Sequence, residues 1–141
     1  MKDKISIIAG GSGQFGVYLS QFLLKKGYKI IITTRNVKLA KKKIPFTNKN
    51  LVLSKLNVLK KKEIIKLILK YHPKLIFYFA SQSSPKLSFA RKKTTLNSNF
   101  IGCKNFLEII QKEKVGCKFV NATSSEIFSE TKKKINLKTK K

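Results

Sequence analysis

The sequence predicts an α/β domain in which about five parallel strands, in the order 3-2-1-4-5, form the middle one of three layers. Short runs rich in isoleucine, leucine and valine alternate with segments of helical periodicity along most of the chain. A glycine-rich stretch also joins the first apolar run to the first helical one. Because right-handed crossovers connect parallel strands, the alternation favours this strand order. With 141 residues, the chain is long enough for one such domain.

The first three elements follow from local composition. An apolar run at residues 4–9 predicts a strand, and residues 14–26 predict a helix that Gly27 ends. The run at residues 28–34 is largely β-branched, which is typical of a strand buried on both faces of a parallel sheet. Helical spacing places four side chains on the buried face of the first helix: Tyr18, Leu19, Phe22 and Leu23.

The remaining elements continue the alternation. Residues 35–43 are basic and predict a loop with a short helix, followed by a break at Pro45. The later predicted elements are a strand at 50–57, a helix at 60–71 before Pro73, a strand at 74–80, a loop at 81–85, a long helix from about 92 to 114, and a strand at 118–123. We therefore expect a dinucleotide-binding domain at residues 1–128 and a basic, disordered tail at residues 129–141.

The glycine-rich stretch is the predicted cofactor site. Gly10 permits a tight turn, Gly13 lets backbone N–H groups approach a phosphate, and Gly16 lets the helix pack closely on the strand. The positive end of the helix then faces the pyrophosphate of a dinucleotide, as in a Rossmann fold. Gln14 and Phe15, between the last two glycines, belong to the same predicted site.

The end of the second predicted strand favours NADP over NAD. No acidic residue that could hold a ribose hydroxyl occurs between Asp3 and Glu63, whereas Arg35 stands where a cation could bind the 2′-phosphate. The alternative is that Arg35 is one more surface cation. The other predicted cofactor contacts are Asn57 and Val58 at the adenine, and Ala80, Ser81 and Gln82 at the end of the fourth strand.

The charge is unusual, because 32 Lys and Arg against 6 Asp and Glu give a net charge of +26. Such a field attracts nucleic acid or anionic membrane surfaces. Only Arg35 and Arg91 are arginine, so we favour a lysine-biased composition without specific nucleic-acid or membrane binding. No signal peptide or run of eighteen apolar residues occurs, which predicts a cytoplasmic location. Cys103 and Cys117 are too few for a zinc site, and we expect no metal.

Several segments together resemble the extended short-chain dehydrogenase/reductases, the NAD-dependent epimerase/dehydratase family. They are residues 10–19, the run Ala-Ser-Gln-Ser at 80–83 with Ser88-Phe89, Asn99 with Gly102, and Ala-Thr-Ser-Ser-Glu at 122–126. Within that family the residues are most similar to those of GDP-mannose 4,6-dehydratases. The resemblance reaches to about residue 129 and implies a fold with a nicotinamide cofactor and a nucleotide-sugar substrate.

The resemblance also implies a mechanism and a set of catalytic residues. In the family, the sugar gives a hydride from C4 to NADP, water leaves across C5 and C6, and the hydride returns to C6. Ser124 matches the hydroxyl residue that binds the C4 oxygen, and Glu126 matches the carboxylate that moves the C5 proton. Gln82 and Ser83 would then lie near the nicotinamide or the sugar. The alternatives are that Ser124 is a turn hydroxyl and that Glu126 is an exposed loop carboxylate. We favour the site, because both residues fall at the carboxyl end of the fifth predicted strand, where open α/β sheets bind ligands.

The sequence departs from the family pattern at several positions. Ala9 replaces a threonine, Phe15 replaces an acidic residue, and Asn57 stands where an aspartate meets the adenine. No Tyr-x-x-x-Lys pair follows the fifth predicted strand, and the substrate domain is missing. The hypotheses are therefore the cofactor part of a dehydratase, truncated or acting with a partner chain that supplies Tyr and Lys; a non-catalytic NADP-binding module; another epimerase or reductase of the family; or a polyanion-binding protein. The protein partners considered are such a complementing chain and a second copy of this chain.

Overall fold

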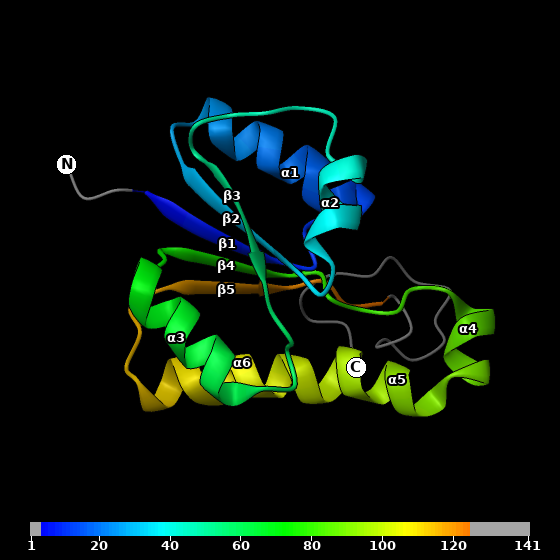
Figure 1. The fold of residues 1–141 in the computed structure, drawn as a ribbon. Coiled ribbons are helices and arrows are strands. Elements are labelled where there is room, and N and C mark those ends of the chain that lie inside the picture. The colour runs from blue at the N-terminus through cyan, green and yellow to red at the C-terminus, as the bar shows by residue number, and fades with distance from the viewer. Residues whose placement is uncertain (1–3, 125–141) are drawn as a thin grey trace, which may run out of the picture.

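The structure is a computed structural model that describes residues 4–124 (Figure 1). Its elements alternate between strands and helices as the sequence predicts. In chain order they are β1 (Ile5–Ala9), α1 (Gln14–Lys25), β2 (Lys29–Thr34), α2 (Val37–Lys43), β3 (Leu51–Lys55), α3 (Lys61–Tyr71), β4 (Leu75–Tyr78), α4 (Pro85–Ala90), α5 (Lys92–Leu96), the π-helical turn η1 (Asn97–Ile101), α6 (Gly102–Lys112) and β5 (Lys118–Asn121).

The five strands form one parallel sheet in the order β3-β2-β1-β4-β5, which confirms the predicted topology. Figure 1 shows α1 and α2 on one side of this sheet and α3 and α6 on the other. Since all strands are parallel, their carboxyl ends meet along one edge, where open α/β sheets bind ligands. The strands are shorter than predicted by one to three residues at one or both ends, because the sequence does not mark where pairing stops.

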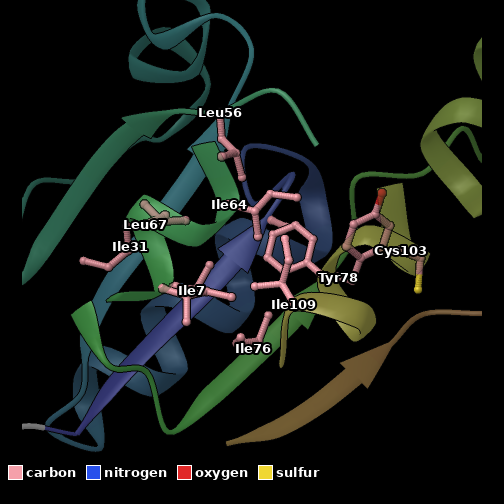
Figure 2. Packing of buried hydrophobic residues seen from close by; sticks show 12 residues of the cluster. Ile7, Ile31, Leu56, Ile64, Leu67, Ile76, Tyr78, Cys103 and Ile109 are labelled. Carbon is pink, nitrogen blue, oxygen red and sulfur yellow. The ribbon is translucent and has the colours of Figure 1, made fainter. Parts of the chain in front are cut away.

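Two apolar clusters hold the layers together. On the α3 and α6 side, Tyr78 and Phe106 are fully buried and meet edge to face at 5.6 Å between ring centroids. Figure 2 shows this cluster, to which the sheet contributes Ile7, Ile31 and Ile76, and the helices contribute Ile64, Leu67 and Ile109. On the α1 side, Ile8, Ile30 and Ile32 pack under Leu23. The central strands β1 and β2 are thus buried on both faces, as predicted for a parallel sheet.

The predicted buried face of α1 is wrong for two of its four residues. Tyr18 and Phe22 are 63% and 56% exposed, whereas Gly16, Ser20 and Leu23 are buried, and Leu23 packs on the sheet. Small residues let the helix approach closely, and the Ser20 hydroxyl donates to the Gly16 carbonyl at 2.6 Å. The side of the helix that carries the smallest residues is therefore the one in contact with the sheet, and the aromatic side chains point away from it.

The long helix predicted from residue 92 is interrupted by the π-helical turn η1. Ser98 and Asn99 of this turn make hydrogen bonds to one another and to neighbouring segments, and π-helical turns are frequent at functional sites. Before it, Ser84 caps a short helix, α4, that the sequence analysis did not predict. The predicted tail at residues 129–141 lies outside the described residues. Among the residues that the structure describes, no helix has the length and apolarity to cross a bilayer.

Candidate functional site

A cleft of about 570 Å³ lies at the carboxyl edge of the sheet, beside the neighbouring strands β1 and β4, between which the strand order reverses. Its volume is in the range typical of small-molecule and cofactor sites. The cleft gathers most of the predicted cofactor residues. Its lining includes Gly10 and Gly13 of the glycine loop, Arg35 after β2, Asn57 and Val58 after β3, and Ala80, Ser81 and Gln82 after β4.

Gly10 is required by its backbone and by its surroundings. Its φ is +74°, in the region that residues with a side chain rarely adopt. A Cβ atom here would also lie 2.6 Å from the Ala80 backbone, so the glycine lets the loop after β1 pass directly beside the end of β4. Its N–H donates to the Thr33 carbonyl at 3.0 Å. Gly10 therefore joins three strand ends at the floor of the cleft.

Gly13 and Gly16 have different surroundings. A Cβ atom on Gly13 would meet nothing closer than the Gly10 carbonyl oxygen at 3.8 Å, so its missing side chain leaves open space beside the cleft. A Cβ on Gly16 would lie 2.4 Å from the Gly11 backbone, within the loop itself, whereas the sequence analysis expected the close contact to be with the strand. Gly13 is the N-cap of α1 and provides no side-chain cap. The first N–H groups of α1, including those of Gln14 and Phe15, are thus suited to a phosphate.

Arg35 follows β2 directly and is exposed, with its side chain along the rim of the cleft. Asn36 beside it has a structural role, because its side chain accepts from Leu39 N–H at 3.0 Å and caps α2. Arg35 also lines a second groove of about 540 Å³ that runs past β3 toward α3. The Arg35 guanidinium takes no part in the hydrogen bond that caps α2, and it is suited to a phosphate group at this rim.

The segment after β3 is more constrained than the sequence suggests. The Asn57 side-chain oxygen accepts from Leu59 N–H at 3.0 Å, and the Asn57 backbone N–H donates to the Glu63 carboxylate at 2.9 Å. This hydrogen bond, together with Lys60, holds the pKa of Glu63 below its ordinary value. Because the Asn57 side-chain oxygen already accepts a hydrogen bond, the side-chain NH₂ group is the part of the amide that can donate to an adenine.

Val58 is held by α6, through residues that sequence reasoning assigned to no site. The Val58 carbonyl accepts from the buried Asn105 side chain at 3.0 Å. A Cβ on Gly102 would collide with Val58 and with the Tyr78 hydroxyl, so α6 can approach only because that position is glycine. A buried polar residue among the apolar positions of a helix was the signal that could have identified Asn105.

Asn99 holds the segment after β4 in place. Its side-chain oxygen accepts from Gln82 N–H at 2.8 Å, and its side-chain nitrogen donates to the Gln82 carbonyl at 3.0 Å. The Gln82 side chain in turn accepts from Ser84 N–H at 3.0 Å. The predicted cofactor residue Gln82 is thus fixed at its main chain and its side chain, and Asn99, which was part of the resemblance only, positions it.

The predicted catalytic residues are only partly described. Ser124 follows β5 at the carboxyl edge and is exposed, and Glu126 lies outside the described residues. None of the sequence's four tyrosines is followed by lysine four positions later. The last of them, Tyr78, is fully buried, donates to the Ser98 carbonyl, and has a raised pKa because of burial and the neighbouring Cys103. It cannot serve as an accessible base.

The fold and the glycine loop define a Rossmann-type dinucleotide-binding domain. A family model described as GDP-mannose 4,6 dehydratase matches residues 7–140, so the chain belongs to that family. The GDP-mannose 4,6 dehydratase of Drosophila melanogaster is 30% identical over 92% of this chain and 35% of its own length. The GDP-mannose 4,6 dehydratase of Dictyostelium discoideum is 28% identical over 90% of this chain and 39% of its own length.

Solved structures agree with the fold. An epimerase from Methanothermobacter thermautotrophicus has a TM-score of 0.80 at 26% identity, over 96% of this chain and 40% of its own. L-threonine dehydrogenase from Clostridium difficile has a TM-score of 0.75 at 26% identity, over 91% and 39%. The chain thus spans little more than a third of the length of the relatives it matches, and it corresponds to their N-terminal part.

Proposed function

We propose that the chain is the NADP-binding part of a nucleotide-sugar dehydratase that acts on GDP-mannose. The observation that carries this proposal is the glycine cradle: Gly10 brings the loop against Ala80, while Gly13 leaves open space beside the first N–H groups of α1. These are the requirements for holding a pyrophosphate at a helix N-terminus. The family supports the substrate class, because its relatives are named for the dehydration of GDP-mannose.

The preference for NADP rests on Arg35. It is an exposed guanidinium at the rim of the cleft, and the described residues around it include no carboxylate other than Glu63, which is bound to Asn57 and Lys60. A guanidinium binds a phosphate dianion through two parallel hydrogen bonds. The cofactor, when bound, would accept a hydride from the sugar and return it.

Substrate chemistry in this proposal needs groups from outside the chain. Ser124 would bind the C4 oxygen, and Glu126 would move the C5 proton, but no tyrosine in the sequence has the lysine partner of the family. A complementing polypeptide or a longer form of the protein would supply that pair and the substrate domain. The second candidate, a non-catalytic NADP-binding module, is favoured by the burial of Tyr78, which removes the last tyrosine of the sequence from the cleft.

Calorimetric titration of the 141-residue chain with NADP and with NAD tests the proposal. We expect NADP to bind at least about ten-fold more tightly, because a charge-assisted hydrogen bond contributes about 1.5–3 kcal/mol. Arg35→Asp should remove or reverse the preference. Arg91→Asp makes the same change of charge at the end of α4, outside the cleft, and should leave the preference intact.

Two results would count against the proposal. Equal affinities for the two cofactors, unaffected by Arg35→Asp, would refute the choice of NADP. No binding of either cofactor would refute the cofactor site as a whole. A further experiment distinguishes the part of a dehydratase from the non-catalytic module: a polypeptide that carries the Tyr-x-x-x-Lys pair is added with GDP-mannose and NADP. Recovery of turnover supports the dehydratase. Loss of that turnover in Glu126→Gln assigns the proton transfer to Glu126.

A further inference from the structure

The second groove, of about 540 Å³, lies between the end of β3 and α3 and is lined by an unusual number of cations. They are Arg35 after β2, Lys55 at the end of β3, Lys60 at the N-cap of α3, and Lys66 and Lys70 within α3. All five side chains are exposed, so their charges act on whatever enters from solvent. We call this the basic groove.

The lysine-rich composition alone does not account for this concentration of charge. The cofactor cleft has more lining residues, yet two of them, Arg35 and Lys43, are cations. In the basic groove, Glu63 already accepts from the Asn57 backbone N–H and lies 3.4 Å from the Lys60 ammonium. Among the described residues that line the groove, no other acidic side chain offsets the cations. The basic groove therefore attracts a ligand with several negative charges.

The cations of α3 form a row. Lys66 and Lys70 are four positions apart, so they lie on one side of the helix, about 6 Å apart along its axis. Lys60 continues the row toward the end of β3, over a total length of about 15 Å. A row of single charges matches a chain of phosphates better than it matches one isolated phosphate or carboxylate.

The floor of the basic groove is apolar. Leu56 and Leu67 line it, together with Tyr71 at the C-terminal end of α3. Tyr71 is only partly buried, and the Lys70 ammonium lies 5.3 Å from the centroid of its ring. An aromatic ring beside a cation lets a base stack while the adjoining phosphate is bound. Inorganic polyphosphate has no group that uses such a floor, and a flat membrane surface does not enter a groove.

We propose that the basic groove binds single-stranded nucleic acid without sequence preference. Phosphates lie along Lys66 and Lys70, and a base lies against Tyr71. A duplex keeps its bases stacked on one another, so it can use the cations and not the ring. The inference goes beyond the proposed function, because these three residues do not line the cofactor cleft.

The phosphate contacts are tested by fluorescence anisotropy with a labelled oligothymidylate of about twelve nucleotides at physiological salt. We expect it to bind more tightly than a duplex of the same length. The double variant Lys66→Gln/Lys70→Gln should weaken the oligothymidylate at least about ten-fold. It should also reduce the slope of log affinity against log salt by about 1.4, because each phosphate contact with a single strand contributes about 0.7.

The matched control is Lys38→Gln/Lys42→Gln on α2. It removes two exposed lysines at the same spacing, and α2 lies on the opposite side of the sheet from α3 (Figure 1). The net charge of the chain changes equally in both double variants. We therefore expect the control to leave the salt slope unchanged and to weaken the oligothymidylate much less than Lys66→Gln/Lys70→Gln does.

Tyr71→Leu isolates the stacking contact. Leucine keeps an apolar side chain against the core cluster that Tyr71 contacts, and it removes the ring. We expect the affinity for oligothymidylate to fall at least about five-fold. The affinity for inorganic polyphosphate, which uses the cations alone, should stay unchanged. Circular dichroism checks that each variant keeps the fold.

Four outcomes would overturn the inference. They are no binding of oligothymidylate at physiological salt, equal loss in the two double variants, equal loss of oligothymidylate and polyphosphate in Tyr71→Leu, and tighter binding of the duplex or of phosphatidylserine vesicles than of the single strand. The outcome for the proposed function is read separately, because Lys66→Gln/Lys70→Gln should bind NADP as the wild-type chain does. A chain that binds oligothymidylate and neither cofactor loses only the proposed function.

Discussion

The two halves of the sheet differ in how completely this chain builds them. At β1 and β2, the strands are buried on both faces, the loop between β1 and α1 is fixed by backbone contacts, and Gly10 N–H bonds to the end of β2. Among residues 4–124, one face of β4 and β5 is only partly covered, and β5 pairs with β4 alone. The first half is the one in which the predicted pyrophosphate site lies, and the second carries Ser124.

Because of this difference, we expect the chain to form a cofactor site without forming a complete catalytic site. The glycine cradle is formed by the loop between β1 and α1 and by the ends of β2 and β4, all of which lie within the described residues of this chain. A catalytic site requires groups held in place by distant segments, and the four tyrosines of this sequence do not provide one with a lysine partner. The comparison therefore predicts a chain that binds a dinucleotide and does not turn over substrate alone.

The largest expected effect is on turnover. The isolated 141-residue chain should show no detectable dehydration of GDP-mannose in the presence of NADP, because loss of a general base costs about 10²–10⁴ in rate and loss of substrate positioning costs more. Chromatographic detection of the 4-keto-6-deoxy product measures this. Robust turnover by the chain alone would show that the half of the sheet formed by β4 and β5 also carries a complete catalytic site. It would also show that a group other than the family's tyrosine acts as the base.

A smaller but still large effect should separate two glycines of the same loop. Gly16→Ala places a Cβ 2.4 Å from the Gly11 backbone, so we expect the free energy of unfolding to fall by about 2–3 kcal/mol. Gly13→Val enters open space, so the free energy of unfolding should change by less than about 1 kcal/mol, as expected for an N-cap substitution. Cofactor binding should nevertheless be lost, because the side chain occupies the approach to the pyrophosphate.

Urea denaturation and calorimetric titration together check this pair. If Gly13→Val unfolds the chain as readily as Gly16→Ala does, the open space beside Gly13 is structural. If both variants keep full affinity, the pyrophosphate does not bind at this loop. Either result would contradict the proposal that the half of the sheet formed by β1 and β2 carries the pyrophosphate site.

The sequence could predict the strand order because the signals for it are local and repeated. Each strand is a short apolar run, and the crossovers between them allow one handedness. The predicted orientation of α1 failed because hydrophobic spacing indicates Tyr18 and Phe22, whereas close packing selects Gly16 and Ser20. Periodicity reports the amount of apolar surface and does not report how near the helix lies to the sheet.

The cleft residues were predicted from their place at strand ends, and the residues that hold them were not. Asn99 and Asn105 act across 17 and 47 positions of sequence, on Gln82 and Val58. A hydrogen bond of this kind depends on how α6 and η1 pack against the sheet, which no local pattern encodes. The role of Glu126 stays a prediction, because the residue lies outside the described part of the chain.

The smallest expected effect concerns Glu63, which holds the segment after β3. Its carboxylate accepts from Asn57 N–H at 2.9 Å, and this bond lowers its pKa in the folded chain below the ordinary value of 4.5. A group with a lowered folded pKa adds stability that is fully present above its unfolded pKa and is lost as the pH falls through the folded pKa. Because the side chain is 39% exposed, solvent screens much of the effect.

We therefore expect Glu63→Gln to lower stability slightly at pH 7, where the wild-type carboxylate is ionised, and to reduce the dependence of stability on pH below about 4.5. The comparison variant is Glu113→Gln, at the C-cap of α6, the end remote from the cleft. Urea midpoints measured between pH 3 and pH 7 should converge for the wild-type chain and Glu63→Gln as the pH falls, because the wild-type carboxylate becomes protonated. If Glu113→Gln flattens the pH profile equally, the Asn57 hydrogen bond is not the cause, and the segment after β3 is held by its backbone turn alone.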